Sequence, residues 1–288
     1  MIEPITAKTI LTKVKNDSYF GLTYNMNLYR GCQHACIYCD TRSKCYQLGE
    51  LSQIRYKSNS IELLEKELYS KKTKGTIGFG SMNDPYMPVE QKMQLTRTAL
   101  GLIEKHRFSL HLITKSDLVL RDIDIIKKIS RIYAAISFTI TTADDELAKI
   151  IEPNAPSPSK RFEALRILNQ SGIYCGITLM PILPFINDTE KNIRDLIENA
   201  SVSGVKYIIP FMGLTLRDGS REYYYHQLDK SFPGLKEKYI HNYGNSYICN
   251  SLNSNKLYKS LYTLLKKMNI PDKMNFYVAQ KNEQLKLF

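Results

Sequence analysis

Residues 29–40 of the 288-residue chain read YRGCQHACIYCD, a stretch that places Cys32, Cys36 and Cys39 close together. This C-x3-C-x2-C spacing supplies three thiolate ligands and no local fourth. A [4Fe–4S] cluster is usually held by four cysteines, so three would leave one iron open. An open metal position is where chemistry takes place, as at catalytic zinc sites. The spacing therefore predicts an iron–sulfur cluster with one reactive iron.

Two other interpretations of these cysteines stay open. A zinc site could be completed by His34 or a remote residue, although zinc ligands usually form two pairs separated by about a dozen or more residues. A disulfide framework is less consistent with six cysteines in 288 residues and with an N-terminus that lacks a signal-peptide pattern. We therefore expect a cytoplasmic protein, where reducing conditions suit a cluster.

The cysteine spacing, with Tyr38 directly before the third cysteine, resembles the radical S-adenosylmethionine (SAM) superfamily. The longer run NLYRGCQHACIYCDTRS at 27–43 resembles the branch that contains spore photoproduct lyase and "DNA repair photolyase" proteins. Further segments similar to that branch extend the likeness over roughly residues 20–215: GFGSMNDPYMPVE at 78–90, ITKSDLVLRDID at 113–124, ISFTITTADDELAKIIEPNAPSPSKR at 136–161 and MPILPFINDTE at 180–190.

The resemblance implies two cofactors, a [4Fe–4S] cluster and SAM, with SAM bound to the open iron through its amino and carboxylate groups. In the superfamily, the reduced cluster cleaves SAM to methionine and a 5′-deoxyadenosyl radical, which abstracts hydrogen from the substrate. The cofactors carry this chemistry, while the protein positions the reacting atoms. A flavodoxin- or ferredoxin-type electron donor is the partner that such chemistry needs.

Short β-rich runs alternate with amphipathic helical stretches along the chain, which predicts a parallel sheet with crossover helices. We expect an α/β fold with a partial (β/α)6 TIM-type barrel over residues 1–213, as the resemblance also implies. Ligands of such sheets bind at the carboxyl ends of the strands, and the cysteine loop directly follows the first strand. Strands are expected at 24–30, 75–80, 109–114, 132–140, 173–180 and 206–211, and helices at about 60–72, 91–106, 118–129, 158–171 and 189–202.

Polar residues near the first two strands are candidate SAM contacts. Tyr38 lies between two cluster ligands, where the superfamily packs an aromatic near the adenine; a structural aromatic is the alternative. Ser81 and Asn83 follow the second strand beside Asp84, where relatives contact the SAM amino group. A turn stiffened by Pro85 is the competing explanation.

Three more candidates lie on later strands and loops. Lys115 ends the third strand and Ser137 lies within the fourth, and the resemblance to spore photoproduct lyase implies that both contact SAM. A lysine where an apolar strand ends is otherwise a surface residue. Arg161 follows a proline-rich run and could bind the SAM carboxylate through its guanidinium.

One position departs from the family pattern. Spore photoproduct lyase donates hydrogen to the repaired thymine from a cysteine three residues before an Asp in the loop after the second strand. Alignment of that Asp with Asp84 places Ser81 at the cysteine position, and a serine O–H bond is too strong to replace a thiol. Cys45 is a candidate donor instead, whereas Cys175 is more simply a small buried hydrophobe. We therefore do not expect repair of spore photoproduct by the same route.

The chain is basic, with 40 Lys+Arg against 28 Asp+Glu and a net charge of +12. This excess favours a polyanionic partner, although a lysine-rich proteome would produce the same bias. Residues 214–288 hold 12 Lys+Arg, 6 Asp+Glu and 9 of the 20 tyrosines. We expect residues 214–279 to form a mainly helical extension, which either packs on the barrel or contacts phosphates and stacks on bases.

The expected C-terminal tail, residues 280–288, ends in the sequence QLKLF. It resembles the Q-L-x-L-F motif by which bacterial repair and replication proteins dock on the DNA polymerase sliding clamp. Leu287 and Phe288 would fill an apolar pocket, while Gln284 bonds at its rim and Leu285 completes the motif. A tail that packs on its own barrel is the alternative.

The sequence thus predicts a radical SAM enzyme that acts on DNA, with hydrogen abstraction from a damaged or modified base as the leading mechanism. RNA, a peptide or a small metabolite is a second substrate hypothesis. A non-enzymatic nucleic-acid-binding protein with a structural cluster is a third. No stretch reaches the ~18 apolar residues of a membrane helix, so no membrane partner is expected.

Overall fold

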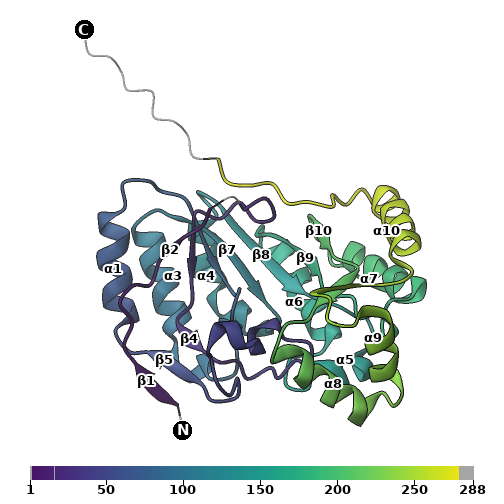
Figure 1. Ribbon diagram of the computed structural model, residues 1–288. Coiled ribbons are helices and arrows are strands. Elements are labelled where there is room, and N and C mark those ends of the chain that lie inside the picture. Colours follow the sequence, from purple (N-terminus) through teal and green to yellow (C-terminus); the bar gives the residue numbers. More distant parts are fainter. Residues whose placement is uncertain (1, 16, 279–288) are drawn as a thin grey trace.

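The computed structural model describes residues 2–15 and 17–278 and is built around an open seven-stranded sheet (Figure 1). Six neighbouring strands run parallel in the order β10-β9-β8-β7-β6-β3, and β2 pairs antiparallel with β3 at one edge. Within the described residues the edge strands do not pair with each other, so the sheet is not a closed barrel. This α/β arrangement is consistent with the expected partial barrel. The strands are β2 (Thr12–Lys13), β3 (Tyr24–Met26), β6 (Thr76–Phe79), β7 (Ser109–Thr114), β8 (Ala134–Thr139), β9 (Tyr174–Leu179) and β10 (Ile208–Pro210).

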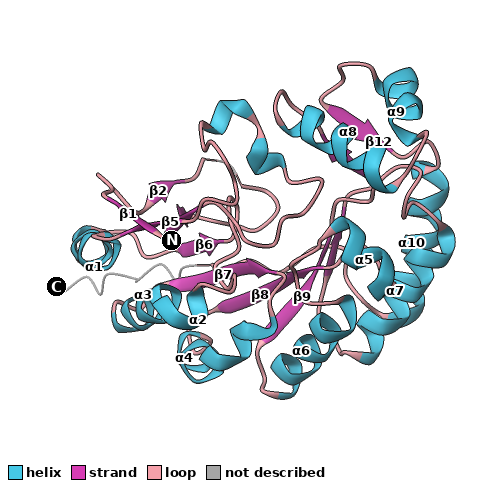
Figure 2. Ribbon diagram, turned by 90° about the horizontal axis from the view of Figure 1, so that it is seen from below, coloured by secondary structure: helices cyan, strands magenta, loops and turns pink. Residues whose placement is uncertain are grey.

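Helices between the strands cover one face of the sheet (Figure 2). Local capping explains where two of them begin: Ser157 Oγ accepts the Lys160 N–H over 3.4 Å, ahead of Pro158 in the first turn of α6. At the start of α7, Thr189 Oγ1 accepts the Asn192 N–H over 3.1 Å. Both patterns satisfy amides that have no partner within the helix. The helices are α1 (Ser60–Ser70), α2 (Glu90–Met93), α3 (Leu95–Lys105), α4 (Ile123–Ile129), α5 (Asp145–Ile151), α6 (Pro158–Gln170) and α7 (Glu190–Val202), with short 3-10 turns η1 (Asp40–Arg42), η2 (Lys44–Tyr46) and η3 (Asp117–Asp122).

The two faces of the sheet differ because successive side chains of a strand point to opposite sides. Leu112, Ile136 and Ile177 are buried in the main core together with the helices. Removal of this apolar surface from water, at roughly 25 cal/mol per Å², is the main force that holds helices to sheet. The opposite face carries polar side chains such as His111 and Ser137, which are also fully buried. The polar face leads toward the candidate site.

Two small sheets and three helices complete the described chain. One sheet has the order β1-β5-β4, and the other is the antiparallel pair β11-β12. Helix α10 buries Leu257, Leu261 and Leu265 beside α7, and the Lys256 amine pairs with Glu190 over 2.6 Å. These elements are β1 (Glu3–Ile5), β4 (Tyr29–Arg30), β5 (Arg55–Lys57), β11 (Gly213–Thr215), α8 (Ser220–Ser231), α9 (Leu235–Tyr243), β12 (Ile248–Asn250) and α10 (Ser254–Met268).

Several tyrosines of the C-terminal region are part of a second core. Tyr224 and Tyr239 are fully buried, and their hydroxyls lie 3.0 Å apart. The Tyr239 hydroxyl also donates to the Pro184 carbonyl over 2.9 Å. The same apolar cluster contains Ile37 and Tyr38 of the cysteine loop. These two tyrosines therefore support that loop by packing and are not available to stack on bases.

Some expected elements divide in the structure. The strand expected at 24–30 becomes β3 in the main sheet and β4 in a small sheet. The helix expected at 91–106 breaks at Gln94, whose φ of 53° lies in the left-handed region. Helix α5 and strands β1, β5, β11 and β12 are not predicted, because their short segments have no long hydrophobic period.

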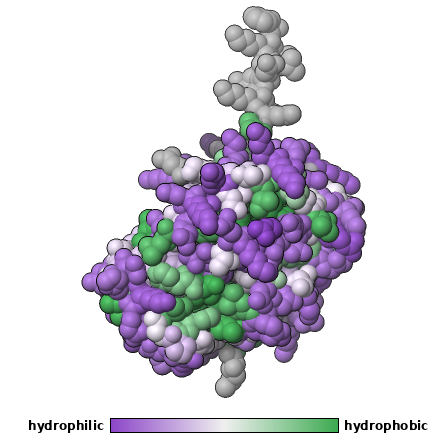
Figure 3. Space-filling view, turned by 90° about the vertical axis from the view of Figure 1, so that its right-hand side faces the viewer, coloured by the Kyte–Doolittle hydropathy of each residue, from purple (hydrophilic) through white to green (hydrophobic). Residues whose placement is uncertain are grey.

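The face on the right of Figure 1, which carries α7, α9 and α10, is largely hydrophilic with a broad apolar patch (Figure 3). Among the described residues, none of the helices has the length and apolar character needed to cross a membrane. The proposed clamp-binding residues, Gln284, Leu285, Leu287 and Phe288, lie outside the described residues.

Candidate active site

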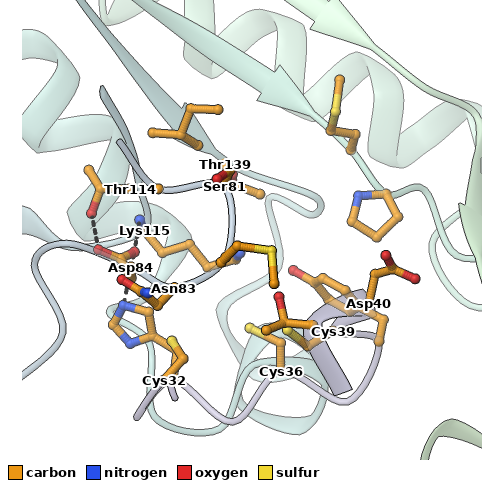
Figure 4. Close-up of a pocket in the computed structure, with 18 of the residues that line it drawn as sticks. Cys32, Cys36, Cys39, Asp40, Ser81, Asn83, Asp84, Thr114, Lys115 and Thr139 are labelled. Carbon is orange, nitrogen blue, oxygen red and sulfur yellow. Dashed lines mark hydrogen bonds and ion pairs between the residues drawn. The ribbon is translucent and has the colours of Figure 1, made fainter. Parts of the chain in front are cut away.

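A cavity of about 400 Å³ opens at the carboxyl ends of the parallel strands (Figure 4). Its walls come from the loops after β4 and β6 and from the ends of β7, β8 and β9. Ligand cavities typically span ~300–1,000 Å³, so this volume suits a small organic cofactor. We call it the cluster cavity; residues that line it include Cys32, Cys36, Tyr38, Cys39, Asp40, Ser81, Met82, Asn83, Asp84, Thr114, Lys115, Thr139 and Met180.

The loop that carries the cysteines is held by backbone contacts to remote segments. Gly31 has a φ of +88°, and a Cβ added there would lie 2.7 Å from the Leu51 carbonyl oxygen, so the position requires glycine. The Cys32 N–H donates to that same carbonyl over 2.9 Å, and the Ile37 N–H donates to Ile151 O over 3.0 Å. Protein contacts therefore fix the loop at both of its ends.

The three cysteines line one cavity (Figure 4). In the described part of the chain, no three His, Cys, Asp or Glu side chains are arranged to hold a single metal ion. In a [4Fe–4S] cluster each thiolate binds a different iron, so its ligands are spread more widely than those around one ion. Burial raises the pKa of Cys32 to about 11 and raises that of Cys36 further. Metal binding at these thiols must therefore displace protons.

A buried carboxylate connects three walls of the cavity. Asp84 accepts hydrogen bonds from Thr114 Oγ1 over 2.7 Å and from Lys115 N over 2.6 Å. Its Oδ2 atom lies 3.0 Å from His34 Nε2. Burial acts to raise the pKa of Asp84, but His34 and these hydrogen bonds outweigh burial and lower it to about 2. The other His34 ring nitrogen faces Asn154 O at 3.3 Å, so this geometry does not favour a zinc site completed by His34.

Tyr38 is fixed by a buried charge network. Its hydroxyl donates to Glu152, which pairs with Arg161. Arg161 is fully buried and also donates to Thr139 O over 2.9 Å. Its guanidinium is therefore engaged inside the protein and does not line the cluster cavity. Sequence reasoning missed Glu152, although an acidic residue directly after the apolar pair Ile150-Ile151 and nine positions before Arg161 could have indicated an ion pair.

Lys115 presents a cation to the cavity. Its Nζ atom lies 5.7 Å from the centre of the Tyr38 ring, and within the described chain that amine forms neither a hydrogen bond nor an ion pair. Burial acts to lower the pKa of Lys115, but the nearby Cys36 and Glu152 groups outweigh burial and raise it. The amine is therefore charged at neutral pH and can bind an incoming carboxylate.

A family model described as "Radical SAM superfamily" matches residues 26–198, more than half of the chain. The chain belongs to the radical SAM superfamily. An uncharacterized protein of Methanocaldococcus jannaschii is 38% identical over 216 residues, which cover 74% of this chain and 78% of that protein. An uncharacterized protein of Mycobacterium tuberculosis is 26% identical over 243 residues, which cover 82% of this chain and 71% of that protein. Family membership makes the chain an enzyme and implies a [4Fe–4S] cluster and SAM.

Solved structures of other proteins share this fold. Spore photoproduct lyase complexed with dinucleoside spore photoproduct superposes with a TM-score of 0.71 at 15% sequence identity, over 95% of this chain and 82% of that one. Streptococcus suis SuiB bound to its precursor peptide SuiA superposes with a TM-score of 0.55 at 13% identity, over 88% of this chain and 47% of that one. At these identities the likeness concerns the fold alone.

The remaining expected SAM contacts differ in position. Asn83 lines the cavity, donates to Tyr29 O over 2.8 Å, and receives no hydrogen bond on Oδ1 from a described residue. Ser81 also lines it and pairs with the Asn25 side chain over 2.9 Å. Ser137 does not reach the cavity: its hydroxyl lies 2.9 Å from His111 Nε2, one layer below Thr139. The structure therefore brings together Tyr38, Ser81, Asn83 and Lys115 with the cluster cysteines, but neither Ser137 nor Arg161.

The two other cysteines considered as hydrogen donors lie outside the cavity lining. Cys45 is exposed in η2, where the Arg217 guanidinium donates to its Sγ atom over 3.6 Å. Cys175 is buried in the main core against Leu165, and burial raises its pKa to about 12. It does not point into the cavity.

Proposed function

We propose that this enzyme abstracts hydrogen from a nucleic-acid substrate after reductive cleavage of SAM, in DNA repair or modification. The observation that carries the proposal is the single cavity shared by three thiols and by Tyr38, Asn83 and Lys115. When bound at such a site, cluster and SAM supply a 5′-deoxyadenosyl radical. The protein would hold a cluster through Cys32, Cys36 and Cys39, in the partial barrel proposed for residues 1–213.

The polar lining fits SAM in charge and position. Lys115 offers an ammonium group to the SAM carboxylate, and the Asn83 Oδ1 atom, which accepts no hydrogen bond from a described residue, can accept one from the SAM amino group. Tyr38, held by Glu152, offers an aromatic face to the adenine. Arg161 acts in this scheme as a positioning residue, because it neutralises Glu152 and does not face the ligand.

Pairs of cations and tyrosines on segments that include η1 and η2 support a nucleic-acid substrate. The Arg42 guanidinium lies 3.6 Å from the centre of the Tyr223 ring. Arg217 lies 4.5 Å from the centre of the Tyr247 ring and 5.7 Å from that of Tyr46. Arg42, in η1, and Tyr46, in η2, directly follow the cysteine loop. Basic and aromatic side chains in this combination suit phosphates and stacked bases, and the net charge of +12 agrees.

RNA in place of DNA, a peptide or a small metabolite is the alternative substrate, and a peptide is supported because SuiB binds a precursor peptide on the same fold. A peptide without phosphate would bind with little dependence on salt, whereas nucleic acid would bind less tightly as salt rises. Because Ser81 stands where spore photoproduct lyase has its donor cysteine, the proposal does not include that enzyme's route of hydrogen return.

Two partner proposals remain with this function. A flavodoxin- or ferredoxin-type protein would supply the electron. The C-terminal tail would dock on the DNA polymerase sliding clamp, beyond the proposed extension of residues 214–279. A synthetic peptide of residues 280–288 should bind the clamp, and Leu287→Ala with Phe288→Ala should abolish binding; an intact peptide that does not bind contradicts this partner.

The decisive experiment uses protein reconstituted anaerobically with iron and sulfide. With SAM and dithionite it should form 5′-deoxyadenosine, and deuterium should pass into that product from deuterated oligonucleotides. Transfer from a peptide or metabolite instead of any oligonucleotide would reject the nucleic-acid proposal. Cys45→Ser is the matched control, because it removes an exposed thiol and keeps all three cluster ligands. The same variant tests Cys45 as a hydrogen donor: loss of the altered oligonucleotide without loss of 5′-deoxyadenosine would support that role.

A further inference from the structure

A second cavity of about 320 Å³ lies directly beside the cluster cavity, and Met82 and Asn83 line both. We call it the basic cavity. Its other walls include Arg30, Lys57 and Tyr46. The two cavities are therefore immediate neighbours, separated by the side chains of Met82 and Asn83.

The cations of the basic cavity come from neighbouring strands of a small sheet. Arg30 is paired with Arg55 in the antiparallel β4-β5 register, and Lys57 lies two residues farther along β5. Residues two apart on a strand share a face, so Arg30 and Lys57 project to the same side. The sheet therefore gathers positive charge next to the cluster loop by its register alone.

Neither cation forms an ion pair in the described part of the chain, and the charge of Glu67 acts on Lys57 only from a longer distance. The Arg30 guanidinium donates to the Gln47 carbonyl oxygen over 3.1 Å, and Lys57 Nζ has no hydrogen-bond or ion-pair partner there. Burial, and next the charge of Arg30, lower the pKa of Lys57. Two like charges held in one half-buried cavity repel each other, and an anion between them would offset that repulsion.

The uncharged wall of the basic cavity suits an aromatic ring. Tyr46 and Leu48 line it, and the Tyr46 hydroxyl donates to Asp40 Oδ2 over 3.2 Å. Asp40 in turn lines the cluster cavity. Tyr46 thus stands between the two cavities, where a base can stack on it.

We infer that the basic cavity binds a phosphate group of the substrate, a phosphodiester of a nucleic-acid strand whose adjacent nucleotide enters the cluster cavity. This inference rests on the proposed function and adds a defined subsite to it. Arg30 and Lys57 would contact the phosphate, and Tyr46 would stack on the flanking base. A free nucleotide carries the same phosphate chemistry, and the experiment separates these two sources.

The test compares the full-length, reconstituted enzyme with the double variant Arg30→Gln/Lys57→Gln. Binding of a short fluorescein-labelled single strand is measured by anisotropy over a range of salt concentrations, in phosphodiester form and in neutral methylphosphonate form. A nucleoside monophosphate serves as competitor. The charge-matched control is Lys127→Gln/Lys128→Gln, which removes two exposed lysines from α4. Iron content and 5′-deoxyadenosine formation without oligonucleotide report whether cluster and SAM chemistry are intact.

The double variant should bind the phosphodiester strand about tenfold more weakly, with a log–log salt slope reduced by about 0.7 for each phosphate that the protein no longer neutralises. It should bind the methylphosphonate strand like the wild type, and it should form 5′-deoxyadenosine normally. Equally weakened binding by the α4 control, or unchanged binding by the double variant, would overturn the subsite while the nucleic-acid function stands. If only the monophosphate binds, and binds through Arg30 and Lys57, the ligand is a free nucleotide and the proposal of a nucleic-acid strand is wrong.

Arg30 lies two residues from Cys32, so its substitution could disturb the cluster. The single variant Lys57→Gln leaves Arg30 unchanged and controls for that effect. This single variant should retain full iron content and show part of the decrease in binding. Normal binding of the phosphodiester strand by this variant would overturn the role of Lys57.

Discussion

The cluster cavity and the basic cavity share a wall and each contains a cation without an ion pair among the described residues, but carboxylates line only the cluster cavity. In and behind the cluster cavity, buried carboxylates have partners within the chain: Asp84 faces His34, and Glu152 pairs with Arg161. In the basic cavity, Arg30 bonds only to a backbone carbonyl among the described residues. The first arrangement holds its own side chains in place before a ligand arrives. The second leaves its positive charge for a ligand to neutralise.

The largest expected effect separates the two cavities by chemistry. Cys36→Ala should lose the cluster and reduce 5′-deoxyadenosine formation to background, because one of three iron ligands is gone. Iron and sulfide analysis and chromatography of the products measure both. The Arg30→Gln/Lys57→Gln variant should keep both properties. SAM cleavage that survives in Cys36→Ala would refute the assignment of the cluster cavity.

The next effect tests whether buried charges behind the cluster cavity depend on each other. Arg161→Met should lower the free energy of unfolding by about 3–5 kcal/mol, because it leaves Glu152 charged and unpaired in the interior. Urea unfolding measures the change. Arg166→Met is the matched control on the same helix, since Arg166 pairs with exposed Glu163 over 2.8 Å; the decrease in its free energy of unfolding should stay below about 1 kcal/mol.

The double variant Glu152→Gln/Arg161→Met completes this test. Removal of the carboxylate charge should restore part of the stability lost in Arg161→Met, because no uncompensated ion remains. If the two single substitutions lower the free energy of unfolding additively in the double variant, Glu152 and Arg161 do not stabilise each other and the prediction is wrong.

A third prediction extends the comparison to the layer below the cluster cavity. Burial lowers the pKa of His111 to about 3, from an ordinary value of 6.5. The unfolded chain therefore takes up a proton below pH 6.5 that the folded chain does not, so this stabilising contribution is complete above pH 6.5 and is lost as pH falls toward 3. From pH 7.5 to 5.5 the decrease in the free energy of unfolding should be about 1.4 kcal/mol.

His111→Phe should lack that part of the pH dependence, because a phenyl ring does not titrate. Ser137 keeps a partner in this variant, since the Tyr207 hydroxyl lies 2.8 Å from its Oγ atom. Urea unfolding of the reconstituted protein at the two pH values gives the comparison. If the free energy of unfolding falls equally in wild type and variant between the two pH values, His111 takes up its proton in the folded protein as well.

The smallest effect belongs to the basic cavity. Lys57→Met should change the free energy of unfolding by no more than about 0.5 kcal/mol, because the half-buried ammonium group has no hydrogen-bond or ion-pair partner among the described residues and feels Glu67 only from a longer distance. Removal of its repulsion with Arg30 should act toward greater stability. Urea unfolding of Lys57→Met and Arg161→Met under the same conditions provides the comparison. A decrease in the free energy of unfolding of Lys57→Met as large as that of Arg161→Met would indicate an ion pair at Lys57.

Much of the fold followed from sequence because strong local signals coincide with elements of the main sheet. The run 109–114 was expected as a strand and forms β7 with the same bounds, and Pro158 marks the start of α6 as expected. Apolar β-branched runs between amphipathic stretches specify this order. Residues that end such strands, such as Lys115, could therefore be placed at the site.

The rest depends on contacts that no local pattern encodes. Glu152 becomes important only because folding brings it to Tyr38, which lies 114 residues earlier in the chain. Ser137 occupies a strand, as expected, but the register places it one layer too deep to line the cavity. Arg30 and Lys57 gather on one face only because β4 and β5 pair antiparallel, and these strands are too short to be recognised by periodicity.

The backbone contact between Ile37 and Ile151 also has a consequence for synthesis of the protein. The Asn154 side-chain amide donates a hydrogen bond to Gln33 O of the same loop over 2.9 Å, across 121 positions of sequence. The three cysteines are synthesised well before Ile151 and Asn154, whose contacts we call the clasp of the loop. At ~5–20 residues per second the clasp follows after about 6–24 s. The cysteine loop can therefore become ordered only after residue 154 has been made, when just over half of the 288-residue chain exists.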